Sequence, residues 1–187
     1  MKNWLFRTTF GFALLSVVVS SCKKDTSEGN DEEVITSMVL TFVPVGGGAT
    51  LTYQYDDADG PGGAVPTQDQ IVLPPSKVYN VTVQLLNKTK MPVGDVTTEV
   101  QMESQAHRFY FEPTPTGSIT VSGFDTDVNG VPLGIKSVWT SGSVSTGKIK
   151  ITLRHYPGNP PEKAMNDTVD SPKSGTDITV EFNTKIQ

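Results

Sequence analysis

Apolar and polar residues alternate along much of this chain, with the two-residue period of β-strands. The clearest case is residues 78–85, where Tyr79, Val81, Val83 and Leu85 are separated by Asn80, Thr82 and Gln84. This period places the apolar side chains on one face of a strand and predicts that this face is buried. Comparable patterns predict further strands over residues 34–43, 51–55, 107–111, 119–123, 136–141, 149–153 and 178–182.

Glycine- and proline-rich clusters separate these segments and predict turns. Residues 46–48, 59–63 and 157–161 are such clusters, and Asn129-Gly130 is typical of a hairpin turn. Helical spacing occurs only over residues 95–106, and residues 158–176 predict a long surface loop. About seven to nine short strands at this spacing indicate one all-β domain over residues 34–187, an antiparallel β-sandwich of immunoglobulin-like or transthyretin-like type.

The residues before this domain differ from it in composition. Lys2 and Arg7 precede an apolar run over residues 10–19, which is shorter than the about 20 residues that a membrane-spanning helix needs. We expect a signal peptide over residues 1–21 and, over residues 22–33, a lipidated Cys22 followed by a flexible acidic tether. A plain secretory signal or a short membrane anchor is the alternative.

Two short motifs in this region resemble those of a known group of proteins. Val19-Ser20-Ser21-Cys22 resembles a bacterial lipobox, and Lys23-Lys24-Asp25 resembles the surface-export signal of Bacteroidota lipoproteins. Asp167-Thr168-Val169 is similar to the O-glycosylation motif of that group, with Thr168 as the acceptor. The resemblance implies a small outer-membrane lipoprotein of a generally uncharacterised kind, some of which accompany TonB-dependent receptors. The surface-facing leaflet is favoured over the periplasmic one.

Charge, cysteine content and missing motifs narrow the function classes. The net charge is −5 and the basic residues are scattered, so nucleic acid is not an expected partner. Cys22 is the sole cysteine, which excludes an intrachain disulfide and, once lipidated, thiol catalysis. The sequence contains neither a G-x-S-x-G elbow nor a P-loop. We therefore expect a non-enzymatic binding module; an enzyme of unrecognised class is a minor alternative.

The two histidines are candidate metal ligands. His107 and His155 each lie at the end of a predicted strand, on the apolar side, and Glu103 and Glu99 precede His107 by four and eight residues. Imidazole and carboxylate together suit zinc or another first-row divalent ion. His107, His155 and Glu103 are therefore the predicted metal ligands. The alternative is two independent histidines, each hydrogen-bonded at the rim of the core.

Two acidic loops suggest a second kind of cation site. Asp125, Asp127 and Asn129, followed by Gly130, resemble the first half of an EF-hand calcium loop, but Lys136 stands where that motif has its bidentate glutamate. A plain turn that caps its own backbone is the alternative. The loop over residues 56–60 is a second acidic cluster, either solvated or bridging a cation. The cofactor expectation is thus a divalent cation, calcium or zinc, or none.

Aromatic residues on the strands suggest a different ligand. Trp139, with Tyr53, Tyr55 and Tyr110, can form a platform that stacks on sugar rings, although strand aromatics more often pack in the core. Two function classes therefore stay open. One is a lipid-anchored module that captures a metal or another extracellular ligand, or that assists an outer-membrane receptor. The other is a surface adhesion or glycan-binding domain with Trp139 as the contact.

Overall fold

The computed structural model describes residues 33–60 and 62–187. The predicted signal peptide, the lipidation site Cys22 and the tether up to residue 32 lie outside the described residues. Within the described part, no helix is both long and apolar enough to cross a membrane.

The described chain forms eleven strands and one short helix, in agreement with the predicted all-β class. All eight predicted strands are present. Three further strands (β3, β4 and β6) have only two or three residues, too few to show an alternating pattern. The elements are β1 (Ser37–Pro44), β2 (Leu51–Asp56), β3 (Thr67–Gln68), β4 (Ile71–Leu73), β5 (Val78–Asn87), β6 (Gly94–Asp95), α1 (Val96–Met102), β7 (His107–Thr114), β8 (Ile119–Ser122), β9 (Lys136–Ser141), β10 (Ser145–His155) and β11 (Gly175–Ile186).

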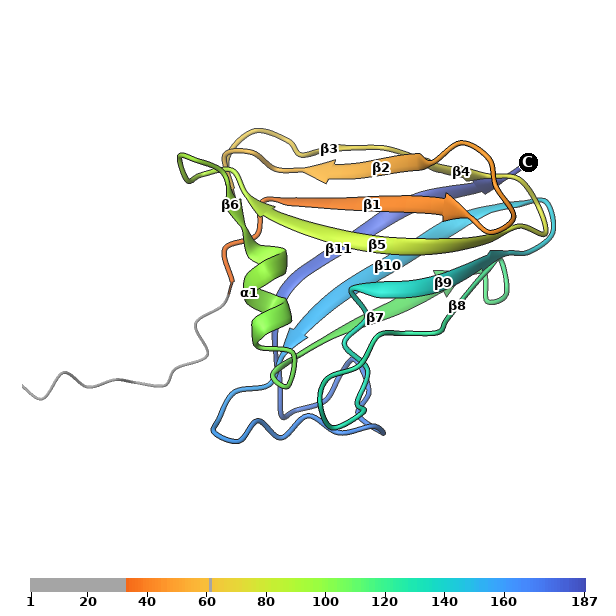
Figure 1. Ribbon diagram of the computed structural model, residues 1–187. Helices are drawn as coiled ribbons and strands as arrows, with labels where there is room; N and C mark the ends of the chain where they lie inside the picture. The colour runs from red at the N-terminus through yellow and green to blue at the C-terminus, as the bar shows by residue number, and fades with distance from the viewer. Residues whose placement is uncertain (1–32, 61) are drawn as a thin grey trace, which may run out of the picture.

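The strands form two sheets that pack face to face as a β-sandwich (Figure 1). The first sheet has the order β3-β2-β1-β5-β9-β8, with β6 paired to β5, and the second has the order β4-β11-β10-β7. All pairs are antiparallel except β4 with β11, which is parallel. The predicted antiparallel β-sandwich is therefore confirmed, with one parallel pair at its edge, where the three-residue β4 runs in the direction of β11.

Aromatic side chains from both sheets meet in the core. The Trp139 ring packs edge-to-face on Phe42, with centroids 5.1 Å apart, and on Phe111 of the other sheet, at 5.6 Å. Its indole Nε1 donates to Ser137 Oγ at 2.9 Å, and no part of the residue is exposed. The prediction of Trp139 as a glycan contact is wrong, because Trp139 lies on the buried face of β9 with Ser137 and Ser141.

The long loop between β10 and β11 lies at the surface, as predicted, and hydrogen bonds from two basic side chains hold it in place. The Arg154 guanidinium donates to Ser174 and to the Ser171 carbonyl. Lys163 Nζ, on the loop, donates to the carbonyls of Ser104, between α1 and β7, and of His107, at the start of β7. The loop thereby closes the end of the sandwich near which α1 lies (Figure 1).

Candidate functional site

The two histidines meet at one end of the second sheet. His107 is the first residue of β7, His155 is the last residue of β10, and the strand register pairs them directly. Their ring centroids are 4.6 Å apart. His107 is fully buried, and the His155 side chain is 14% exposed. The predicted placement of both histidines at the end of the apolar face, where a strand meets its loop, is confirmed.

A third strand supplies a carboxylate that the sequence did not reveal. The register of β10 and β11 shifts between Leu153, opposite Ile178, and Arg154, opposite Thr176, so Asp177 is the extra residue of a β-bulge. Strict alternation places Asp177 on the same face as Thr179 and Glu181, which are exposed. The bulge instead turns the side chain inward, where it is 0% exposed, and bulges commonly re-aim a side chain in this way.

The Asp177 carboxylate faces one ring nitrogen of each histidine. Its Oδ2 is 3.6 Å from His107 Nε2, and its Oδ1 is 4.0 Å from His155 Nδ1. Both separations exceed the usual hydrogen-bond length of about 2.7–3.2 Å. Two ligand atoms each about 2.0–2.1 Å from one zinc ion lie about 3.3–3.4 Å apart at the tetrahedral angle. The two observed nitrogen–oxygen distances are longer than this by about 0.2–0.7 Å, so small shifts of the side chains would bring the atoms to the spacing of two ligands on one ion.

The protonation of His107 suits a metal ligand. Its Nδ1 lies 3.1 Å from the Glu103 carbonyl oxygen, which only accepts, so Nδ1 carries the proton. Burial lowers the pKa of His107 from 6.5 to about 4, so the ring is neutral at pH 7. Nε2, which has no hydrogen bond with the described residues, then presents a lone pair toward Asp177.

Glu103 closes the site from the solvent side. It caps the C-terminus of α1 and is exposed, and its carboxylate lies within 4.8 Å of a ring nitrogen of each histidine. Among the described residues, this is the one group of three or more His, Cys, Asp and Glu side chains close enough for a common ion. The structure therefore brings together all three predicted ligands. Asp177 is not a member of this group, but its carboxylate lies beside both histidines.

Further carboxylates surround this entrance. Burial, and then the charges of Glu99 and Glu103, raise the pKa of Glu33 from 4.5 to about 7. A cluster of acidic groups next to two imidazoles creates a negative potential that attracts cations.

We expect the raised pKa of Glu33 to be visible in the pH dependence of stability. The folded state holds this proton up to about pH 7 and the unfolded state only up to about 4.5, so Glu33 lowers the free energy of unfolding as pH rises through this range. His107 acts in the opposite sense between pH 4 and 6.5. Urea unfolding from pH 4 to 8 should therefore show a steeper rise of stability with pH in Glu33→Gln than in the wild type. If the free energy of unfolding changed with pH in the same way in Glu33→Gln and in the wild type, the raised pKa of Glu33 would be contradicted.

The loop over residues 125–130 is a turn that caps its own backbone. Asp127 Oδ1 accepts from the amides of Asn129 at 2.8 Å and Val131 at 3.0 Å, and Asp125 Oδ1 accepts from the amides of Gly134 and Lys136. Asp127 Oδ2 pairs with Lys163 Nζ at 2.9 Å. The prediction of Asp125, Asp127 and Asn129 as calcium ligands is wrong, because an ammonium group already lies against this carboxylate.

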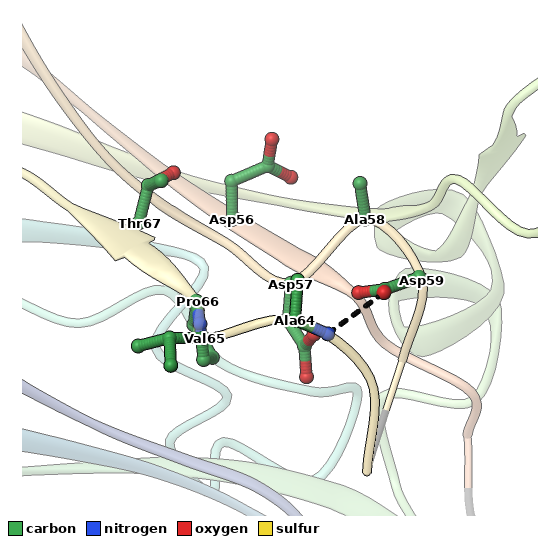
Figure 2. Close-up of a pocket in the computed structure, with 8 residues that line it drawn as sticks. All are labelled: Asp56, Asp57, Ala58, Asp59, Ala64, Val65, Pro66 and Thr67. Atoms are coloured by element: carbon green, nitrogen blue, oxygen red, sulfur yellow. Dashed lines mark hydrogen bonds between the residues drawn. The ribbon is translucent and has the colours of Figure 1, made fainter.

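The second acidic loop does not form a convergent site either. Asp56 pairs with Lys88 at 2.8 Å, and Asp59 Oδ2 accepts from the Ala64 amide at 2.8 Å. Figure 2 shows that the carboxylates of Asp56, Asp57 and Asp59 point in different directions around a shallow hollow. The solvated-loop interpretation therefore describes this segment.

The remaining candidates lie outside the histidine site. Tyr110 and Tyr156 share a hydrogen bond of 2.7 Å, and Tyr53 donates to the Val72 carbonyl. Tyr55 is half-buried and packs against the core, so all three predicted platform tyrosines serve the fold. Thr168 is exposed on the loop after β10, and its glycosylation stays a prediction.

Comparison with known proteins finds no family model, no curated protein and no solved structure that matches the chain.

Proposed function

We propose that this domain binds a first-row divalent cation, with zinc the best fit. His107, His155 and Asp177 are the inner ligands, and Glu103 is an exposed fourth donor. The observation that carries this proposal is the neutral, buried His107, whose Nε2 lies 3.6 Å from Asp177 Oδ2. Such a spacing is long for a hydrogen bond but close to that of two ligands on one ion.

The donor set discriminates among metals. Calcium and magnesium prefer six or more oxygen ligands, whereas two imidazoles with carboxylates suit zinc and its neighbours. Four donors from one chain fill a tetrahedral zinc site, which favours capture and retention of the ion over hydrolysis.

We further propose that the module acts at the outer membrane, anchored by lipid on Cys22 and exposed preferentially at the cell surface. The lipobox-like residues before Cys22 and the charged residues 23–33 support this location. Two acyl chains hold a protein stably on a membrane, and the tether leaves the domain free to deliver its ion to a receptor. The partners in this proposal are the membrane and an outer-membrane receptor.

Isothermal titration tests the metal proposal. We expect the full chain with Cys22→Ala, which removes the thiol, to bind one zinc per molecule and to bind calcium at least about 100-fold more weakly, since the inner nitrogen donors disfavour calcium. His155→Ala should weaken zinc binding by at least about tenfold. Asp125→Asn, in the self-capped turn, is the matched control and should leave zinc binding unchanged. Zinc binding that is insensitive to His155→Ala would contradict the proposal.

A further inference from the structure

A surface depression adjoins the histidine site. Its volume is about 650 Å³, within the range of small-molecule pockets. Two apolar side chains that line it, Met102 and Val128, are 75% and 83% exposed. Ala106 and Pro161 add further apolar surface. Exposed apolar side chains scattered singly are common, but here they line one concave surface.

Glu103 belongs to both the depression and the candidate metal site. Gly158 and Asn159, shortly after His155, form another part of the depression's wall. Of the four proposed ligands, Glu103 is the exposed one, while His107 and Asp177 have fully buried side chains. A molecule in the depression therefore reaches the ion from the side of Glu103.

We propose that the domain takes its metal together with a small organic chelator whose apolar part packs in this depression. The inference rests on the proposed metal binding. The chelator's oxygen donors replace the Glu103 carboxylate, while His107, His155 and Asp177 keep the ion. Three protein ligands leave a tetrahedral zinc ion a position for an outside ligand, and the coordination can expand to five. The occupant is thus a bidentate oxygen chelator with an aromatic or aliphatic body.

Two hydroxamates that share a chelating group test this inference on the zinc-loaded chain with Cys22→Ala. Benzohydroxamate carries a phenyl ring and acetohydroxamate a methyl group. We expect benzohydroxamate to bind at least about tenfold more tightly, because its ring loses apolar surface to the depression. Met102→Ser and Val128→Ser should each reduce the ratio of the benzohydroxamate affinity to the acetohydroxamate affinity.

Val144→Ser is the matched control. Val144 is 72% exposed, directly before β10, whose eleven residues separate it from His155 by roughly 35 Å. The ratio should stay at its wild-type value in this variant. Glu103→Ala should keep zinc bound and should bind both hydroxamates more tightly, since the competing carboxylate is gone.

The outcomes separate the two proposals. Zinc binding with equal affinity for both hydroxamates, or with a ratio unchanged by Met102→Ser and Val128→Ser, would overturn the chelator inference and leave the metal site intact. If zinc-loaded Glu103→Ala bound the hydroxamates more weakly than the wild type, the proposed replacement of the Glu103 carboxylate by the chelator would be overturned. Failure to bind zinc at all would overturn the proposed function, and the inference with it.

Discussion

Replacing Lys163 with methionine is expected to lower the free energy of unfolding by about 3–5 kcal/mol, because it leaves the buried Asp127 carboxylate without its cation. The two side chains are each 1% exposed, and their charged atoms are 2.9 Å apart. Lys163 Nζ also donates to the carbonyls of Ser104 at 2.6 Å and His107 at 3.0 Å. Methionine has nearly the same volume but cannot make any of these contacts.

Equilibrium urea unfolding followed by circular dichroism measures this loss. Lys173→Met is the matched control, since its partner is Asp167 in a pair where the lysine side chain is 34% exposed, and such pairs contribute about 1 kcal/mol or less. Adding Asp127→Asn to Lys163→Met should recover part of the loss, because the uncompensated charge is removed. Equal destabilisation by the two lysine variants would contradict this role for Lys163.

Replacing Asp177 with asparagine is expected to weaken zinc binding by at least about 100-fold while the fold persists. Asparagine keeps the shape of the side chain but removes the negative charge, which is the one inner-ligand charge that offsets the cation. The Asp177 carboxylate is buried and lies 3.6 Å from His107 Nε2 and 4.0 Å from His155 Nδ1. Zinc titration, with circular dichroism as the check of folding, measures the effect.

Asp170→Asn is the control for this change. Asp170 lies on the loop that leads into β11, is exposed, and is not one of the proposed ligands. Its replacement should leave zinc affinity within about twofold of the wild-type value, the small change typical of an exposed position. If Asp177→Asn bound zinc as tightly as Asp170→Asn, the carboxylate would not be a ligand, and the site would be a packed pair of histidines.

The strands and half of the site follow from local patterns. Alternation along β5 predicts which of its side chains are buried, and the same period places His107 and His155 on the apolar side of their strands. The same alternation does not predict the inward position of the Asp177 side chain. A β-bulge reverses the face of a residue, and nothing in the order Thr176-Asp177-Ile178 marks it.

The acidic loop shows a second limit. Asp125, Asp127 and Asn129 match a calcium pattern locally, and the cation that decides the outcome lies far along the chain, on Lys163. Pairing between distant segments is set by the tertiary fold, so a motif alone does not reveal that its charge is already neutralised. Trp139 was ambiguous for a similar reason, since strand aromatics suit both a core and an exposed platform.

X-ray absorption at the zinc edge of the loaded chain with Cys22→Ala tests the metal site most directly. We predict a shell of four nitrogen and oxygen atoms at about 2.0–2.1 Å, with the outer-shell scattering of two imidazoles. That imidazole signal should disappear in the variant with both His107→Ala and His155→Ala. A wild-type spectrum without imidazole scattering, or one unchanged in the double variant, would contradict the histidine site.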